Sequence, residues 1–238
     1  MLNQNVTIGG MFKPIALAFL NLLYPKNCHV CSSLFDRHTP AYDDYICFEC
    51  FSSMKRTSPA ESNAPIPETA DSAYDRLLTC YLYEGAVREL VHKFKYENRP
   101  YLSKTITKLM SEFLNEVGAA LFETIDCFVP VPLHPARLRE REFNQSELLT
   151  GILGACYNKP SVSLLRRLRN THPQVSLTEH ERQTNIQGAF ALNNLSAKDK
   201  NILLIDDVIT TSATVEEASR TLKKSGAKNV WVLAFAKG

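Results

Sequence analysis

The stretch that decides the fold is Asn201–Ser225, with the sequence NILLIDDVITTSATVEEASRTLKKS. Its uninterrupted apolar run, Ile202–Ile205, is typical of a strand that is buried on both faces, as in a parallel sheet. From Val215 onward the apolar residues recur at helical spacing, and Gly226 follows two lysines that are typical of a helix end. The stretch therefore predicts a buried parallel strand, a short turn and a helix.

The turn between this strand and this helix carries the chemistry. Asp206 and Asp207 end the apolar run, and small, mostly hydroxylated residues follow at Thr210, Thr211, Ser212, Ala213 and Thr214. A helix that begins in such a turn offers free backbone N–H groups and the positive end of its dipole to an anion. Carboxylates beside a phosphate would repel it unless they hold another group, such as a ribose diol or Mg²⁺. The turn therefore predicts a sugar-phosphate site, with the phosphate at residues 210–214 and the sugar hydroxyls on the aspartates.

Two further apolar runs extend the predicted sheet. Val230–Ala236 and Ile125–Val131 both read as buried parallel strands. Ligands of open α/β sheets bind outside the carboxyl ends of the strands, so the loop after Val131 and the Asp206 turn should converge on one crevice. A receiver domain also has paired acids after its first strand, but it needs a phosphorylatable Asp on a later strand, and only 31 residues follow Asp207.

Residues 202–214, ILLIDDVITTSAT, resemble the 13-residue phosphoribosyl-pyrophosphate motif of type I phosphoribosyltransferases. The resemblance implies an open parallel α/β sheet with helices on both faces, and a site for phosphoribosyl pyrophosphate with Mg²⁺. Ser212 departs from the motif, because the family usually carries Gly there, and Gly permits close backbone approach. Thr210 stands where 6-oxopurine enzymes have an Asp that handles the base proton, which disfavours hypoxanthine-type salvage.

Motifs upstream narrow the resemblance to the ComF family of competence-associated proteins. VPVPLHPAR at 129–137, REFNQ at 141–145 and GAF at 188–190 occur in that family's order, and the likeness runs from Tyr24 onward. Glu142 departs from the family, which usually has Gly there. The resemblance implies a cytoplasmic role in natural transformation, in which the protein handles incoming single-stranded DNA alongside a competence helicase. Residues 169–188 would then be a mobile loop that closes over the ligand.

Positive charge concentrates between His134 and His172, where basic and acidic residues sum to +4 against +2 for the whole chain. A pyrophosphate group needs positive partners, and we assign His134 and Arg137 to it. We expect contacts with single-stranded DNA from five arginines: Arg137, Arg139, Arg141, Arg167 and Arg169. The alternative is that these arginines lie on a solvated face.

Two CxxC pairs near the N-terminus predict a metal site. One pair is Cys28 and Cys31, the other is Cys47 and Cys50, and the spacing between the pairs is typical of a four-cysteine zinc site. Four thiolates complete the tetrahedron around Zn²⁺, so the metal would be structural. The alternative is two disulfides, which a reducing cytoplasm disfavours. We expect burial for the other three cysteines, at 80, 127 and 156.

Length and composition are those of a soluble globular protein, with 238 residues of which 45% are hydrophobic and 22% charged. The longest apolar stretch, Ile15–Tyr24, is about half of the ~20 residues that a membrane-spanning helix needs. We interpret it as a short surface helix and expect a cytoplasmic protein. The net charge of +2 by itself predicts no polyanion partner.

The domain organisation follows from these patterns. Residues 1–56 are predicted to form an N-terminal helix and the zinc module, and residues 57–72, rich in Ser, Pro, Ala and Glu, to form a linker. Residues 73–238 form the phosphoribosyltransferase-like domain. Within it, residues 73–118 are predicted to form a cap, or hood, from a strand near 77–83 and two helices.

Three functions remain open from the sequence. The first is a DNA-uptake protein that binds phosphoribosyl pyrophosphate or a similar sugar phosphate, and also single-stranded DNA. The second is an active phosphoribosyltransferase of nucleotide metabolism that releases pyrophosphate, although no residue stands out as the proton acceptor. The third is an assembly adaptor whose zinc module docks a partner protein.

Overall fold

The computed structural model describes residues 26–36, 38–58, 72–118, 120–170 and 186–238. The predicted helix at 15–24, most of the predicted linker and most of the predicted mobile loop lie outside the described residues. The chain divides into two compact units, residues 1–53 and residues 54–238. Among the described residues, no helix has both the length and the apolar character needed to cross a bilayer.

The smaller unit is built around its cysteines. Helix α2 (Phe48–Ser52) begins at Cys47, whose sulfur accepts a hydrogen bond from the backbone N–H of Cys50. Two isolated antiparallel bridges, Asn27 to Leu34 and Ala41 to Cys47, hold the loops that carry the two CxxC pairs. Tyr42 and Phe51 stack with ring centroids 4.0 Å apart.

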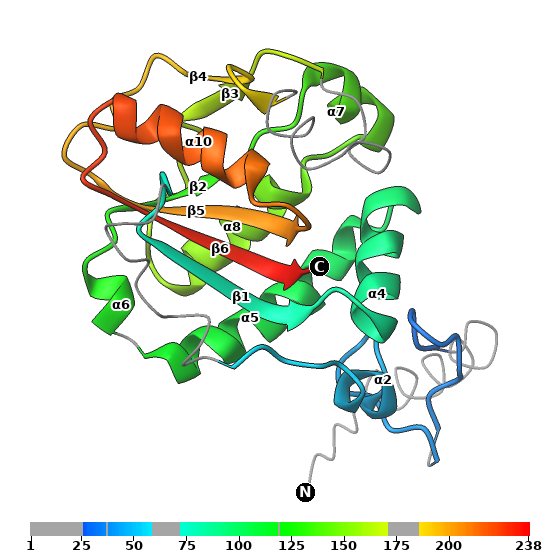
Figure 1. The fold of residues 1–238 in the computed structure, drawn as a ribbon. Coiled ribbons are helices and arrows are strands. Elements are labelled where there is room, and N and C mark those ends of the chain that lie inside the picture. The colour runs from blue at the N-terminus through cyan, green and yellow to red at the C-terminus, as the bar shows by residue number, and fades with distance from the viewer. Residues whose placement is uncertain (1–25, 37, 59–71, 119, 171–185) are drawn as a thin grey trace, which may run out of the picture. The chain divides into compact units, whose positions relative to one another are not determined.

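The larger unit contains a four-stranded sheet in the order β1-β6-β5-β2, in which every pairing is parallel (Figure 1). Its strands are β1 (Arg76–Leu82), β2 (Cys127–Pro130), β5 (Asn201–Ile209) and β6 (Asn229–Lys237). The predicted strands near 77–83, 125–131, 201–205 and 230–236 are all present. Because β1 is an edge strand of this sheet, the segment 73–118 contributes to the sheet as well as two helices.

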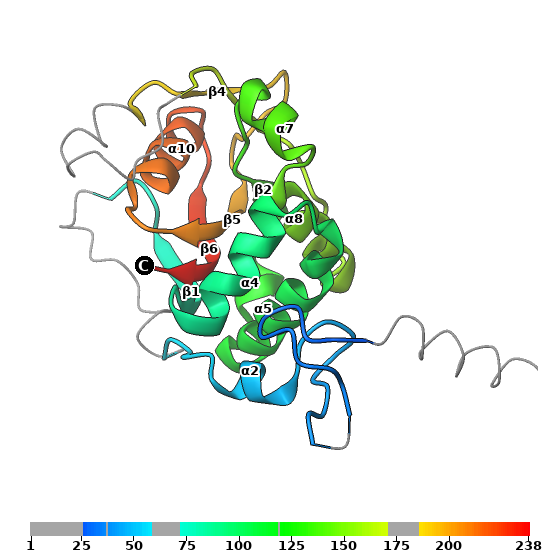
Figure 2. The same cartoon turned by 90° about the vertical axis from the view of Figure 1, so that its right-hand side faces the viewer.

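Helices cover both faces of the sheet, as Figure 2 shows, with α10 on one side and α5 and α8 on the other. Their bounds are Ala213–Lys224 for α10, Ser103–Val117 for α5 and Gln145–Cys156 for α8. The remaining helices of the described residues are α4 (Gly85–Tyr96), the 3-10 turn η1 (Pro100–Leu102), α6 (Ala120–Glu123) and α7 (Pro135–Arg141). The predicted fold class, an open parallel sheet with helices on both faces, is confirmed.

The core forms where apolar strand residues meet the apolar stripes of the helices. Ile202 and Leu204 of β5 pack in one buried cluster with Val215, Ala218 and Leu222 of α10. Cys80 and Cys127 are buried as predicted, whereas the prediction for Cys156 is wrong, because it lies at the exposed end of α8.

Helix α7 and strands β3 and β4 are among the elements that the sequence patterns did not predict. Helix α7 has no buried residue, so its segment shows no apolar period, but the side chain of His134 caps it and Pro135 begins it. Strands β3 (Leu165–Arg167) and β4 (Phe190–Leu192) pair antiparallel in a separate two-stranded sheet. They lie on either side of residues 169–188, the segment that was predicted as a mobile loop.

Candidate functional site

The candidate site lies at the carboxyl end of β5, where the chain turns into α10 (Figure 1). Strand β5 continues through both aspartates to Ile209, so it is longer than the apolar run alone predicted. The carbonyl of Ser212 accepts the N–H of Glu216 at 2.8 Å and so starts the helix. The preceding N–H groups of the first turn have no intrahelical acceptor. The turn therefore has the feature that an anion site requires.

Asp207 is held by a lysine from a distant part of the chain. Nζ of Lys95, in the last turn of α4, lies 2.9 Å from Oδ1 of Asp207, and the two side chains are only 15% and 8% exposed. The same Oδ1 accepts the N–H of Val208 at 2.6 Å. Burial opposes the charge of Lys95, but the attraction of Asp207 outweighs burial and raises the pKa of the ammonium.

Asp206 has polar neighbours but no direct ion pair among the described residues. Its Oδ1 accepts hydrogen bonds from the hydroxyl of Ser146 at 2.9 Å and from the N–H of Asp207 at 2.9 Å. Burial, with the negative charge of Asp207 added, raises the pKa of Asp206 to about 7. Lys95 and Ser146 oppose that rise but do not cancel it.

Both aspartates thus use Oδ1 for their contacts with the protein. Among the described residues, neither Oδ2 has a hydrogen bond or an ion pair. Two carboxylate oxygens on adjacent residues therefore remain as acceptors. Their chemistry suits two hydroxyl groups or a cation.

The turn between α7 and α8 lies next to Asp206 in the candidate site. Asn144 caps α8 by accepting the N–H of Ser146 at 3.1 Å, and its Nδ2 donates to the carbonyl of Val131 at 3.2 Å. This pair of bonds ties the end of β2 to the helix that carries Ser146. The family-like motif REFNQ therefore acts here through its Asn, which positions the hydroxyl that contacts Asp206.

Glu142 has the left-handed backbone conformation, with φ of 64°. Glycine adopts this region without strain, which explains why glycine suits the position. Glu142 is accommodated in part by a hydrogen bond from Nδ2 of Asn98, the residue that lies two positions beyond α4.

Three of the five predicted arginines lie close enough to influence one another. Burial lowers the pKa of Arg167, and the charges of Arg137 and Arg141 add to that effect, whereas Asp206 opposes it. Arg139 is exposed on α7, and Nη1 of Arg169 donates to the carbonyl of Gln187 at 2.7 Å. The structure therefore brings 137, 141 and 167 together near Asp206.

An exposed aromatic residue accompanies Arg141. The guanidinium carbon of Arg141 lies 5.0 Å from the ring centroid of Tyr96, and its Nη2 donates to the Tyr96 hydroxyl at 3.3 Å. The ring of His92 lies 5.1 Å from that of Tyr96, which is 61% exposed. Tyr96 is 45 positions from Arg141 in the chain and reaches it only through the fold.

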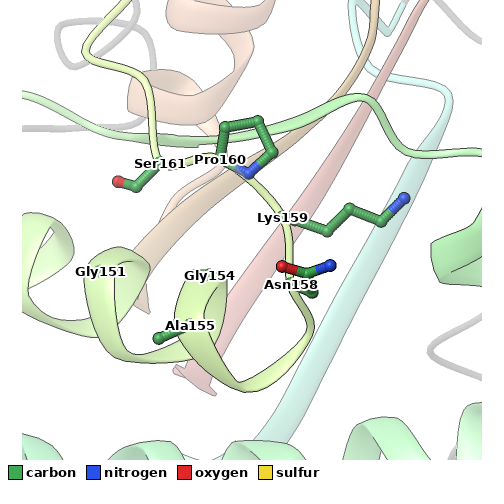
Figure 3. Close-up of a pocket in the computed structure, with 7 residues that line it drawn as sticks. All are labelled: Gly151, Gly154, Ala155, Asn158, Lys159, Pro160 and Ser161. Atoms are coloured by element: carbon green, nitrogen blue, oxygen red, sulfur yellow. The ribbon is translucent and has the colours of Figure 1, made fainter.

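Residues that the structure describes line two hollows beside α8. One, of about 220 Å³, lies beside α7 and is lined by Pro132, Leu138, Asn144, Glu147, Arg166 and Arg167 among others. The other, of about 440 Å³, lies at the far end of α8 (Figure 3). Its one lysine, Lys159, donates to the carbonyl of Ile125 at 2.7 Å, so the second hollow offers little charge to a ligand.

The remaining predicted residues fall as follows. Thr210 is exposed, and residues 211–214 are half-buried in the turn before α10 and its first residues. His134 is half-buried, and its Nδ1 accepts the N–H of Ala136 at 3.2 Å, so this ring nitrogen caps α7. The carboxylate of Glu217, on α10, accepts the N–H of Gly188 at 2.8 Å.

Sequence reasoning missed Lys95, Ser146 and Tyr96. Lys95 follows Val87 and Val91 at intervals of four residues on α4, so it continues a buried stripe, and a lysine in such a stripe is a signal that was available. Ser146 and Tyr96 gave no comparable signal, because their roles depend on contacts with distant residues.

The four predicted metal ligands come together in the smaller unit. The sulfur atoms of Cys28, Cys31, Cys47 and Cys50 all lie within 4.8 Å of one another. Four sulfurs at about 2.3 Å from a tetrahedral Zn²⁺ would be about 3.8 Å apart, and Sγ of Cys31 lies 3.8 Å from Sγ of Cys47. Backbone N–H groups of Val30 and Cys47 point at Sγ of Cys28, both at 3.4 Å. The cluster fits a four-thiolate metal ion.

Comparison with known proteins places these features in a family. No protein-family model matches the chain. Competence protein F of Haemophilus influenzae is 27% identical over 175 residues, which are 70% of this chain and 75% of that protein. DNA utilization protein YhgH of Escherichia coli K12 is 30% identical over 164 residues, 67% of this chain and 72% of that protein. Competence protein ComFC of Bacillus subtilis is 33% identical over 146 residues, 61% and 57% of the two chains.

Among solved structures, a purine phosphoribosyltransferase from Pyrococcus horikoshii aligns with 57% of this chain and 83% of its own, at 16% identity and a TM-score of 0.33. Glutamine phosphoribosylpyrophosphate amidotransferase from Bacillus subtilis aligns with 45% of this chain and 22% of its own, at 16% identity and a TM-score of 0.32. Superpositions this loose add nothing to the assignment, which rests on the sheet and on the curated relatives. The chain belongs to the ComF family of competence-associated proteins.

Proposed function

We propose that this protein serves in DNA uptake in the cytoplasm, and that it binds phosphoribosyl pyrophosphate or a similar sugar phosphate at the carboxyl end of β5. The observation that carries the sugar-phosphate part is the pair of open Oδ2 atoms on Asp206 and Asp207, next to a helix start. The DNA-uptake part rests on the family, since its relatives are named competence and DNA utilization proteins.

Each group of the ligand has a counterpart in the site. The two Oδ2 atoms accept the sugar hydroxyls, and the N–H and hydroxyl groups of residues 210–214 receive the 5′-phosphate. Arg137, on α7, and His134, which caps that helix, would contact the pyrophosphate. Mg²⁺ bound with the pyrophosphate would supply charge neutralisation, and a structural Zn²⁺ would be held by the four cysteines.

The test is calorimetric titration with phosphoribosyl pyrophosphate and Mg²⁺. We expect saturable binding by the wild-type chain and none by the double variant D206N/D207N, because an amide is a weaker acceptor than a carboxylate. Asp199→Asn is the matched control: Asp199 is exposed, precedes β5 and has φ of 60°, a region in which Asn is well tolerated. Absence of binding by the wild-type chain at millimolar ligand would contradict the proposal.

Binding of single-stranded DNA is the second part. The charges of Arg137, Arg139 and Arg141 on α7 predict affinity that falls steeply with salt, and the exposed ring of Tyr96 offers a stacking surface. The two contributions are separable, because charge changes the salt dependence and stacking does not.

We expect Tyr96→Ala to weaken binding of an oligonucleotide by about 1–3 kcal/mol, a typical value for one stacked base, and to leave the salt slope unchanged. Arg139→Ala should instead reduce the slope by about one. Fluorescence anisotropy between about 50 and 200 mM salt measures both, with Leu195→Ala, an exposed apolar residue, as the control. Equal loss of slope in both variants would remove Tyr96 as a stacking residue.

A second function, turnover by phosphoribosyl transfer, is favoured by one observation. Asp206 has a pKa raised to about 7, which is near the value that suits a general base at neutral pH. Incubation with phosphoribosyl pyrophosphate and a panel of nucleobases tests it. Rapid release of pyrophosphate that is lost in D206N would establish turnover, and binding without release would restrict the protein to a ligand-dependent role.

A further inference from the structure

Lys95 lies outside every motif that points to the sugar-phosphate site, yet its ammonium contacts that site. Nζ lies 2.9 Å from Oδ1 of Asp207, and both side chains are largely buried. A buried charge requires a partner, because removing an ion from water costs several kcal/mol that an attractive contact must offset. The pair joins residues 112 positions apart, so it is a contact of the tertiary structure.

The end of α4 is fixed on both sides of Lys95. The ring of Phe94 is buried and lies 5.5 Å from that of Phe143, and the hydroxyl of Tyr96 accepts from Arg141. Two residues past the helix, Asn98 donates to Glu142. A lysine in the middle of these contacts presents its ammonium from a fixed backbone.

Both aspartates and Arg141 interact electrostatically with the Lys95 ammonium. Asp207 and Asp206 face Lys95 from β5, and Arg141 faces it from the end of α7. Asp206 in turn lies near Ser146 of α8, and its charge raises the pKa of Arg167 of β3, which the charge of Arg137 lowers. Two adjacent carboxylates without a nearby cation hold a proton between them, and a protonated carboxyl loses one of its acceptor oxygens.

We propose that Lys95 is a positioning residue of the sugar-phosphate site: its ammonium offsets the negative charge of the Asp206–Asp207 pair and engages Oδ1 of Asp207, so that Oδ2 is presented to a ligand hydroxyl. The inference rests on the proposed function and assigns to it a residue that contacts the dyad and not the ligand. It also explains how two carboxylates coexist beside a polyanion, because the cation offsets one of them.

The test is the pH profile of phosphoribosyl pyrophosphate binding, measured by calorimetry with Mg²⁺ between about pH 6 and pH 8.5. We expect Lys95→Met to weaken binding at least tenfold at pH 7 and to move the midpoint of the profile to higher pH, because a dyad without its cation holds a proton longer. Lys95→Arg keeps the charge and should restore most of the affinity. Lys93→Met is the matched control, since Lys93 is on the same helix and pairs with Glu89.

Loss of Lys95 leaves Asp207 buried without its cation, so a folding defect must be separated from a binding defect. The double variant K95M/D207N removes both charges, and we expect it to unfold at the wild-type temperature and, because it lacks the carboxylate of Asp207, not to bind. Wild-type affinity and an unmoved pH midpoint in Lys95→Met would overturn the inference and leave the proposed function intact. Failure of the wild-type chain to bind would overturn the proposed function itself, and this role with it.

Discussion

Asp206 and Asp207 are neighbours in the chain, but the fold gives them different surroundings. Asp207 has the ammonium of Lys95 at 2.9 Å, whereas Asp206 has the neutral hydroxyl of Ser146. Burial, and the negative charge of Asp207, hold the pKa of Asp206 at about 7. A residue that is costly to ionise and is nevertheless an Asp is typical of a binding or catalytic site.

This difference predicts a pH-dependent effect of Asp206→Asn on stability. The folded-state pKa of Asp206 is raised above its unfolded value, so the fold favours the protonated form and loses stability as pH rises from about 4 toward 7. Asn resembles the protonated acid and lacks this penalty. We expect D206N to raise the melting temperature by several degrees at pH 8 and to leave it unchanged at pH 4.

Thermal unfolding followed by circular dichroism at the two pH values measures the effect. Asp199→Asn, at an exposed position, should show no such difference. A melting temperature of D206N that is equal to or below that of the wild-type chain at pH 8 would show that Asp206 is not destabilising when ionised.

At the scale of the element, the end of α8 lies so close to the chain segment that follows it that one helix position has room only for glycine. The helix ends beside the segment Asn158–Ser161, and Figure 3 shows Gly151 and Gly154 on its last turns. A Cβ added at Gly154 would lie 2.8 Å from the carbonyl oxygen of Lys159, whereas one added at Gly151 would meet nothing within 4 Å. The close approach matters because Pro160 and Val162 then pair with Phe128 at the edge of the sheet.

The two glycines therefore predict opposite effects of the same substitution. Gly154→Ala should destabilise the protein by about 1–3 kcal/mol, because backbone must move to relieve the contact. Gly151→Ala should stabilise it by about 0.5–1 kcal/mol, the usual gain for Ala over Gly inside a helix. Urea denaturation of the two variants measures both, and a loss of stability in Gly151→Ala as large as that in Gly154→Ala would contradict the packing.

At the scale of the whole molecule, the chain divides into two units that differ in their apolar core and regular structure. The larger unit has a continuous apolar core on both faces of its sheet. The described part of the smaller unit has little regular structure beyond α2. Its loops and this helix meet at the cluster of four cysteines. A unit of this size usually needs a metal or disulfides to fold.

We therefore expect removal of the metal by a strong chelator to unfold the smaller unit and to spare the sheet. Hydrogen exchange measured by mass spectrometry should show lost protection near Ile46 and Cys47, and unchanged protection in β5 and β6. Cys28→Ser should reproduce the effect, whereas Cys156→Ser, at an exposed cysteine outside the cluster, should not. Less than one metal ion per chain, or full protection after chelation, would contradict a structural metal.

The sequence by itself determined the elements and the local shape of the site. Apolar runs specify β5 and β6, the acids and hydroxyls that follow Ile205 specify the turn, and CxxC spacing specifies the cysteine cluster. These features are predictable because each depends on residues that are close in the chain. Helix α7 was not predicted, because a polar segment without buried residues shows no helical spacing of apolar residues. Its start, with His134 as the cap and Pro135 as the first residue, was a signal that the sequence did contain.

The tertiary structure alone decided which distant residues complete the site. Lys95 reaches Asp207, Ser146 reaches Asp206 and Tyr96 reaches Arg141 across separations of 112, 60 and 45 residues. Such contacts depend on the order of strands in the sheet and on how the helices pack against it. A local pattern does not encode them, because the free energy that selects them comes from burying the whole core at once.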